Sequence, residues 1–472
     1  MIRRVALVSL AAGFLTGCTT LGPDYVKPSP DNISSAEFVY AGEYNTGAPL
    51  SNWWTAFDDP ILNGLVEIGI SRNNSLRAAS ANLAAARAAL GVARSNRLPS
   101  DEATITRQQV RTSSAPSVFS DGTPLPTVNL ISLGTDVAWE VDLFGRVTRT
   151  IEIAKAQSEA SFSQLVDLQT VIIADIADNY LDMRGAQAQL TVAEENALVQ
   201  TETLRLTELI RDAGRGTDLD VEQARAQLET TRASIPPLRA QIVSAANNIA
   251  VLTGQTPQDV TSLIETPRPL PTVQTALPIG NPAELLRRRP DVAASERQLA
   301  AAVSQIGLEM ASAYPRVDLV GGVVLASDGV SDLDTTAALG FNFGPSISWS
   351  LGNFLTSRNL VDAAEAEVAA AYADYEQALL VALAETESAL NTQAQLQKQL
   401  THLRLAENAS LEAARLSQIR FRAGRSSFLQ VLDAQGRALL ASDQRVATET
   451  EIARAQVAVF RALRAGPNIL QN

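Results

Sequence analysis

The chain has 472 residues and a formal net charge of −13, with 51 acidic against 38 basic side chains. This balance argues against a nucleic-acid-binding surface, which would carry basic clusters. The only histidine, His402, lies in a polar helical stretch, which disfavours a histidine-based metal site or a Ser-His-Asp arrangement. Paired acidic residues such as Glu194 and Glu195 are adjacent and read as a solvated helix surface. No enzyme activity, metal or nucleic-acid partner is therefore expected.

Residues 1–17 have the anatomy of a signal peptide, with two arginines followed by an apolar stretch at 5–14. The sequence Leu15-Thr16-Gly17 then leads into Cys18, the only cysteine, in an order that resembles a bacterial lipobox. The mature chain is expected to begin at Cys18 and to carry a diacylglycerol and an acyl chain there. Thr19, rather than an aspartate, resembles lipoproteins that are exported onward to the outer membrane. Acyl chains anchor a protein to a membrane without spanning the bilayer.

The chain repeats itself, and the repeat predicts its organisation. An offset of 210 positions lays Trp139 on Trp349 and the sequence QAQLT at 187–191 on QKQLT at 397–401. Two copies of one long unit are predicted, at 60–254 and 283–464. An N-terminal extension at 18–59, a proline-rich linker at 255–282 and a C-terminal tail at 465–472 complete the chain.

Each copy is predicted to contain a helix, a β-hairpin and a long helical hairpin. In the first copy these are a helix over Pro60–Asn96, a β-hairpin at 104–143 with strands Thr104–Arg111 and Asn129–Leu143, and a helical hairpin at 146–254. In the second they are a helix over Glu284–Ser312, a β-hairpin at 317–351 with strands Val317–Ala326 and Leu339–Leu351, and a helical hairpin at 357–464. The proline-free helix from Arg146 to Ala213 would extend about 100 Å.

The far ends of the two helical hairpins carry the same helix-terminating residues. Gly214-Arg215 and Gly424-Arg425 stand where a helix C-terminus favours a residue with positive φ. The segments Thr217-Asp218-Leu219-Asp220 and Ser426-Ser427 follow closely and supply N-cap candidates. Each pair is expected to form the tip of a tight helical hairpin.

After the signal peptide there is no apolar run of the length a transmembrane helix needs, so any crossing must be by strands. The strands alternate apolar and polar residues, which is typical of a transmembrane barrel with a lipid face and a lumen face. The expected lipid-facing residues are Trp139, Val141, Phe341, Phe343 and Trp349. Four strands cannot close a barrel, so a trimer with twelve strands is predicted. The alternation alone would also fit a soluble sheet, and the helices alone an antiparallel coiled-coil rod.

Several motifs resemble the TolC-like outer-membrane efflux factors, in particular the lipid-anchored OprM/NodT type. They are LGPDYVKP at 21–28, AWEVDLFGR at 138–146, LLRRRPDVAASERQLAAA at 285–302, YPRVDL at 314–319 and FLQVLDAQ at 428–435. The resemblance covers essentially the whole mature chain. It implies a homotrimer in the outer membrane, with a twelve-stranded barrel, a long α-helical barrel in the periplasm and an equatorial belt. Trp53-Trp54, the segment Pro257–Pro282 and the tail would contribute to that belt.

The resemblance also implies a function. Such a trimer is a duct that carries small molecules, by default drugs and other amphiphiles, from the periplasm to the exterior without chemistry. Its partners would be outer-membrane lipid, a periplasmic adaptor protein at the helical tips and an inner-membrane pump of the resistance-nodulation-division class. A type I protein secretion duct is the alternative, and a structural envelope-spanning lipoprotein a third reading.

Side chains just after the tips constrict the periplasmic end in that family. Here they fall at Asp220, Leu429 and Asp433. Where relatives often carry an arginine one turn after this aspartate, the chain has Gly436, and Arg437 comes next. The gate is therefore expected to be held more loosely, or to be held by Arg437. Asp220 alternatively serves only to cap and charge a helix N-terminus.

Overall fold

The computed structural model describes residues 20–29, 37–40, 51–111, 127–273, 278–350, 352 and 354–464. Cys18, the predicted signal peptide and the predicted tail lie outside the described residues. The predicted fold class, mainly α-helical with four strands, is confirmed for the described residues. The chain divides into two compact units, each built from several stretches of sequence.

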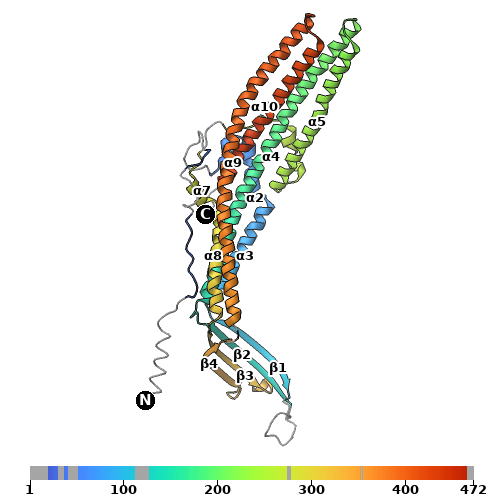
Figure 1. Ribbon diagram of the computed structural model, residues 1–472. Helices are drawn as coiled ribbons and strands as arrows, with labels where there is room; N and C mark the ends of the chain where they lie inside the picture. The colour runs from blue at the N-terminus through green and yellow to red at the C-terminus, as the bar shows by residue number, and fades with distance from the viewer. Residues whose placement is uncertain are drawn as a thin grey trace. The chain divides into compact units, whose positions relative to one another are not determined.

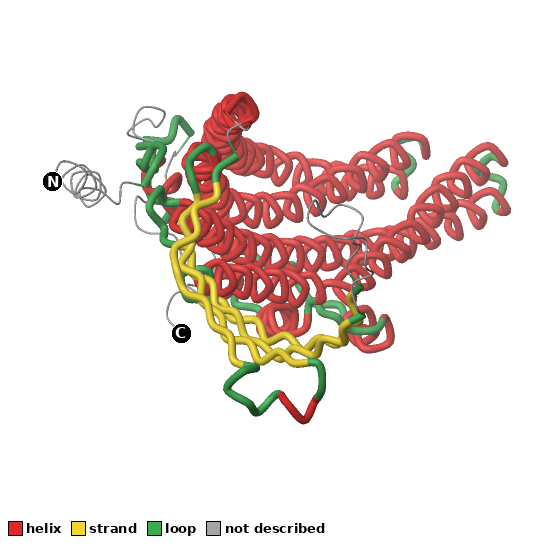
Figure 2. The backbone as a smooth tube through the Cα atoms, turned by 90° about the horizontal axis from the view of Figure 1, so that it is seen from below, coloured by secondary structure: helices red, strands yellow, loops and turns green. Residues whose placement is uncertain are grey.

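The first unit comprises Met1–Pro28, Leu83–Ser161 and Ser295–Tyr375 and contains the only sheet of the described residues. Its strands are β1 (Ser100–Val110), β2 (Val128–Glu140), β3 (Arg316–Ser327) and β4 (Leu339–Ser348). Neighbours in the order β1-β2-β3-β4 are all antiparallel, so the hairpins of the two sequence copies join edge to edge. Figure 2 shows the four strands as one curved sheet.

Each β-hairpin is preceded by a medium-length helix and followed by a very long one. The helices α3 (Asn74–Ser95) and α8 (Pro290–Ser312) come before the hairpins, and α4 (Arg146–Asp212) and α9 (Phe354–Arg422) come after them. The two long helices have 67 and 69 residues, which corresponds to about 100 Å each. No helix in the described part of the chain combines the length and the apolar character required to traverse a bilayer.

The second unit comprises Ser29–Asn82, Phe162–Ala294 and Glu376–Asn472. Here α4 lies beside α5 (Asp218–Leu252) and α9 beside α10 (Phe428–Ala462), which gives two helical hairpins (Figure 1). The short elements of this unit are η2 (Trp53–Phe57), α2 (Pro60–Arg72), η3 (Pro257–Val260), α6 (Thr261–Glu265) and α7 (Pro282–Arg288). The Trp53 ring stacks on Phe460 at a centroid distance of 4.8 Å in a large apolar core.

Two predicted helices are interrupted. The helix expected over Pro60–Asn96 is α2 and α3, because Asn73 leaves the helical conformation and its Oδ1 accepts a hydrogen bond from the Leu76 N–H at 3.0 Å. The helix expected over Glu284–Ser312 is α7 and α8. Arg289 separates them with ψ of 123°, since the ring of Pro290 disfavours a helical conformation in the preceding residue.

The N-terminal residues that follow Cys18 are fixed to the first unit from Thr20 onward. The buried Arg149 guanidinium donates to the Leu21 carbonyl oxygen at 3.0 Å and contacts the Asp24 carboxylate at 3.0 Å. The Tyr25 hydroxyl donates to the Glu296 carboxylate, and burial together with that carboxylate raises the pKa of Tyr25. These contacts hold the segment from Leu21 to Tyr25 against α4 and α8.

Candidate functional site

The register of the sheet places most of the large apolar side chains of β2, β3 and β4 on one face, together with Ile105 of β1. Leu133 lies opposite both Ile105 and Leu325, and Val323 lies opposite Phe341. Residues directly opposite in an antiparallel pair share a face. The alternation of β4 is matched only in part by β1 and β3. Arg107 of β1 lies on the apolar face, and Val320 and Val324 of β3 lie on the opposite one.

Most of the residues predicted to face lipid are solvent-exposed in the single chain. Phe341 and Phe343 are 82% and 84% exposed, and Trp139 and Trp349 are exposed too. Val141 is half-buried and lies beyond the end of β2 at Glu140, which corrects the strand boundary predicted at Leu143. A sheet with large exposed apolar side chains and two open edges, β1 and β4, needs further partners.

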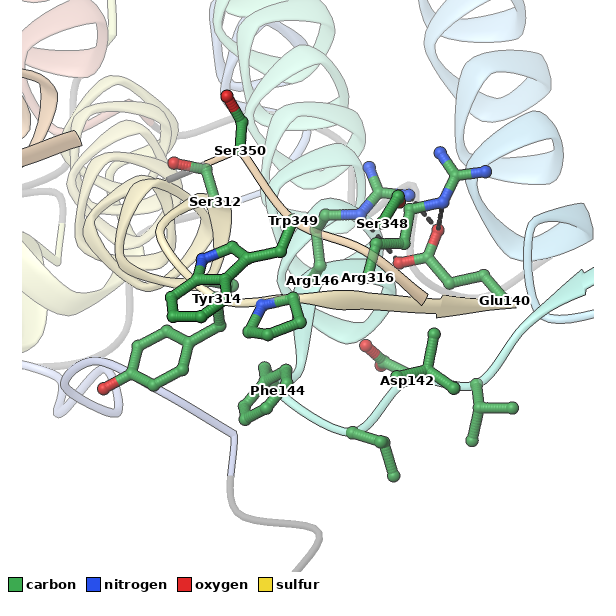
Figure 3. Close-up of a pocket in the computed structure, with 15 residues that line it drawn as sticks. Glu140, Asp142, Phe144, Arg146, Ser312, Tyr314, Arg316, Ser348, Trp349 and Ser350 are labelled. Carbon is green, nitrogen blue, oxygen red and sulfur yellow. Dashed lines mark hydrogen bonds and ion pairs between the residues drawn. The ribbon is translucent and has the colours of Figure 1, made fainter. Parts of the chain in front are cut away.

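The AWEVDLFGR motif forms the corner between β2 and α4 (Figure 3). Asp142 caps α4 by accepting from the Val147 and Thr148 N–H groups at 3.0 and 2.8 Å. The Arg146 Nε donates to Glu140 Oε1 at 2.8 Å. The motif thus fixes a change of direction of the chain rather than supplying reactive groups.

The YPRVDL motif lies against the same corner. Tyr314 stacks on Phe144 at a centroid distance of 4.8 Å, and Arg316 Nε lies 2.8 Å from Asp318 Oδ2. The two motifs border a cavity of about 550 Å³ at the base of the sheet. Glu140 pairs with both Arg146 and Arg316, and Asp142 is occupied in capping α4, so the charged groups of the cavity serve the structure.

The two helical tips have the same backbone geometry. Gly214 and Gly424 adopt φ of +71° and +68°. The N–H of Arg215 donates to the Ile210 carbonyl oxygen at 3.0 Å, and the N–H of Arg425 donates to the Arg420 carbonyl oxygen at 2.8 Å. This is the Schellman termination of a helix. Both arginine side chains are exposed. The positive φ predicted for both glycines is confirmed, whereas adaptor contact stays a prediction.

The helices that leave the two tips begin differently. Thr217 and Asp220 form a capping box, in which the Asp220 N–H donates to Thr217 Oγ1 at 3.2 Å and Asp220 Oδ2 accepts from the Thr217 N–H at 3.1 Å. The N-cap of α10, Ser427, makes no side-chain capping bond, contrary to expectation. Asp220 therefore helps to cap α5, which is the alternative role expected from the sequence. This role does not depend on any position at a pore.

Three of the predicted aperture residues lie on one face of α10. Leu429, Asp433 and Arg437 are four residues apart and all exposed. Arg437 Nε lies 3.0 Å from Asp433 Oδ2, so the pair predicted as one possibility does form within the helix. An acidic residue four positions before a basic one is the favoured orientation. The gating role of these residues stays a prediction.

The opposite face of the FLQVLDAQ motif joins the two hairpins, which sequence reasoning missed. Phe428 and Val431 are buried in an apolar cluster with Ala224 of α5. Gln435 Nε2 also donates to Thr203 Oγ1 of α4 at 3.3 Å. The spacing of 428, 431 and 435 is typical of a buried helix face, and it could have shown that this face is buried, although not what it contacts.

Comparisons with known proteins agree with one another. The profile of the family described as "Outer membrane efflux protein" matches residues 65–255 and 281–464. Nodulation protein T of Rhizobium leguminosarum bv. viciae is 28% identical over 96% of this chain and 91% of its own length. The solvent efflux pump outer membrane protein SrpC of Pseudomonas putida is 28% identical over 99% of both chains. A solved structure of the outer-membrane channel OprN is 39% identical, covers 95% of this chain and 99% of that one, and superposes with a TM-score of 0.90.

Proposed function

Because the chain belongs to the outer membrane efflux protein family, it is an outer-membrane channel component of an efflux system, and we propose that three copies close a single duct. In this proposal each copy contributes four strands to a twelve-stranded barrel in the outer membrane. The two helical hairpins of each copy extend into the periplasm. The predicted resemblance to TolC-like efflux factors is confirmed at the level of the family.

The observation that carries the trimer is the open sheet with one apolar face. Backbone groups at the edges of β1 and β4 would have no hydrogen-bond partner in lipid. Joining β4 of one copy to β1 of the next removes both edges in every copy. Phe341 and Phe343 would then face hydrocarbon, and the face that carries Asp136 and Asn342 would line the water-filled interior.

The periplasmic mouth of this duct would be formed by the side chains after the tips. Three copies of Asp433 would bring carboxylates together at a narrow opening, which attracts cations. Arg437 counters each carboxylate and would hold the mouth partly closed. Leu429 would add an apolar constriction one turn earlier.

The proposed partners and cargo follow from this arrangement. The exposed tips around Gly214-Arg215 and Gly424-Arg425 would contact a periplasmic adaptor, and a resistance-nodulation-division pump would supply energy. Small amphiphiles are the proposed cargo, supported by the relative whose name assigns it to a solvent efflux pump. A diacylglycerol and an acyl chain on Cys18 would add an anchor.

Single-channel conductance of the detergent-extracted protein, measured together with its mass, tests the proposal. A trimer that passes small, cation-preferring currents is the expected result. A monomer, or a trimer that conducts nothing, would overturn the duct and favour a structural rod.

A further inference from the structure

The two helical hairpins, α4–α5 and α9–α10, are equivalent at an offset of 210 residues. Helices α5 and α10 both have 35 residues, and the offset holds at both of their ends. One ion pair joins the helices of each hairpin at the same place with its charges reversed. Arg239 Nη2 lies 2.8 Å from Glu194 Oε1, and Arg404 Nη2 lies 3.0 Å from Glu449 Oε1. The surroundings of equivalent residues in the two hairpins can therefore be compared directly.

One face of α4 is buried under α10 of the same chain. Ala174 of α4 shares an apolar core with Ala453 and Val457 of α10. Gly185 of α4 approaches α10 so closely that a Cβ there would clash with the Thr450 side chain. The first hairpin thus packs its long helix against the second hairpin of its own chain.

Ion pairs reinforce this contact within the chain. Asp178 Oδ1 lies 2.7 Å from Arg454 Nε, and Asp175 Oδ1 lies 3.0 Å from Arg461 Nη1. The acidic residues belong to α4 and the basic ones to α10. The seam between α4 and α10 is therefore both apolar and charged.

The equivalent face of α9 is exposed in the single chain. Leu380 is 53% exposed, whereas its counterpart Thr170 on α4 is 1% exposed. Ala384 and Gln395, which correspond to the buried Ala174 and Gly185, are exposed as well. A large apolar side chain and its neighbours on this face need a cover that the chain itself does not supply.

A matching stripe is exposed on α5. The residues equivalent to those by which α10 contacts α4 are Ala240, Val243, Asn247 and Val251, and all four are exposed. Val243 is 44% exposed, whereas its counterpart Ala453 is fully buried. Spacings of three and four residues place the stripe on one side of the helix. In Figure 1, α5 and α9 are the outer helices of the four, with α4 and α10 between them. Each chain therefore exposes both halves of a contact that it makes once within itself.

The two exposed faces are complementary in size but not in charge. Gln395 and Ala240 stand at the positions of Gly185 and Thr450, so the smaller residue moves from the long helix to the shorter one. Ser388 and Ser244 stand at the positions of the pair Asp178–Arg454, and Val251 stands at the position of Arg461. A contact between these faces would be neutral where the contact within the chain is charged.

We propose that α5 of each copy packs on the exposed face of α9 of the next copy and so repeats between chains the contact of α10 with α4. Ala240 of one copy lies against Gln395 of the next, and Ser244 lies against Ser388. Each copy offers one stripe and one face, so a closed ring covers all of them. This proposal rests on the trimer proposed above and assigns its helical seam to particular residues.

Oxidation of the full-length double variant Ala240→Cys/Gln395→Cys in detergent tests the contact. Each copy carries one cysteine of each kind, so denaturing gels should show covalent dimers and trimers that reduction returns to monomers. Ala240→Cys/Gln397→Cys is the matched control, because Gln397 is also exposed but two residues farther along a helix points to a different side. The control should stay monomeric on the same gels.

A charge exchange tests the same seam without a covalent bond. Ser388→Asp combined with Ser244→Arg places between copies the ion pair that Asp178 and Arg454 form within the chain. This double variant should dissociate at a higher temperature than Ser388→Asp combined with Ser244→Asp, which places like charges together. Equal dissociation temperatures for the two double variants would overturn the proposal.

The mass and conductance of the wild type separate this proposal from the duct itself. A conducting trimer in which Ala240→Cys/Gln395→Cys remains monomeric after oxidation keeps the duct and overturns the seam alone. A wild-type monomer overturns both. Covalent trimers from this variant but not from its control, formed by protein that keeps the wild-type mass under reducing conditions, support the seam.

Discussion

The indole Nε1 of Trp349 donates a hydrogen bond to the Ala313 carbonyl oxygen at 3.1 Å, so the residue that follows β4 is tied to the residue that follows α8. The first sequence copy contains the equivalent bond, from Trp139 Nε1 to the Arg97 carbonyl oxygen at 3.0 Å. Because the same hydrogen bond occurs in both copies, the contact between each helix and the following hairpin is a feature of the repeated unit.

Trp349→Phe should therefore remove the hydrogen bond to Ala313 while an aromatic ring still fills the position. The substitution removes one hydrogen bond, worth about 1 kcal/mol, and keeps most of the ring. We expect a lower temperature for dissociation of the oligomer on semi-native gels. Tyr314→Phe is the control, since the Tyr314 hydroxyl has no hydrogen-bond partner in the described part of the chain and its ring stack on Phe144 is preserved. Equal dissociation temperatures for wild type and Trp349→Phe would contradict the role of the bond.

Gly424 and Gly436 lie near the same tip but should respond oppositely to alanine. A Cβ at either position would meet no atom within 4 Å, so steric clash does not distinguish them. Gly424 has φ of +68°, which costs an alanine about 1–2 kcal/mol, whereas Gly436 is helical and alanine there gains about 1 kcal/mol.

Hydrogen exchange of the tip amides measures this difference directly. Gly424→Ala should accelerate exchange around the turn, and Gly436→Ala should slow it in the first turns of α10. Gly424→Asn should lie between wild type and Gly424→Ala, because asparagine tolerates positive φ better than alanine. Faster exchange in Gly436→Ala would contradict this prediction, because it would show that helix propensity does not determine the stability of the first turns of α10.

The RRRPD motif predicts a sensitivity to acid. Arg289 is fully buried and donates to Asp291 Oδ2 at 2.6 Å and Glu385 Oε2 at 2.9 Å. Burial alone would raise the pKa of Asp291, but its hydrogen bonds and attraction to Arg289 outweigh burial and hold the pKa below the ordinary value of 3.8. A depressed carboxyl pKa contributes stability above the unfolded value, and that stability is lost as pH falls through the folded value.

Thermal midpoints from pH 7 down to pH 3 test this expectation. The wild type should lose stability below about pH 4, and Asp291→Asn should lose less over the same interval because its side chain does not titrate. At pH 7 Asp291→Asn should be less stable than wild type by about 1–3 kcal/mol. Glu385→Gln, whose side chain is half-exposed, is the matched control and should cost less. Identical acid profiles for wild type and Asp291→Asn would refute the assignment.

The sequence predicts the parts of this protein whose rules are local. Positive φ at Gly214 and Gly424 follows from helix termination, and the sheet face follows from alternation in β4. The helix break at Arg289 could have been predicted, because a proline follows it. The helix break at Asn73 could not have been predicted, since the Asn73 amide donates to the Leu252 carbonyl oxygen, far away in sequence. The burial of Phe428 beside Ala224 likewise depends on how two hairpins meet.

The Asp433–Arg437 pair permits a test that separates a lock from a charge ring. If Arg437 holds the mouth partly closed by countering the repulsion among the Asp433 carboxylates of the three copies, Arg437→Ala should raise single-channel conductance. The contact of 3.0 Å itself lies within one helix, so its loss alone releases no contact between helices. If the aspartates act mainly through charge, the two variants should shift cation preference in opposite directions. Removing the carboxylate lowers cation preference, and removing the guanidinium raises it.

We expect Arg437→Ala to raise both conductance and cation preference. Asp433→Ala should lower cation preference, since Arg437 would then add uncompensated positive charge to the mouth. Glu412→Ala is the control, because Glu412 forms a similar exposed pair with Arg415 at 2.7 Å but lies on α9, before the tip turn. Its conductance should match wild type. Should Asp433→Ala leave both conductance and ion preference unchanged, Asp433 has no part in the gate, and the constriction would have to come from Leu429 or from Asp220 beyond its capping role.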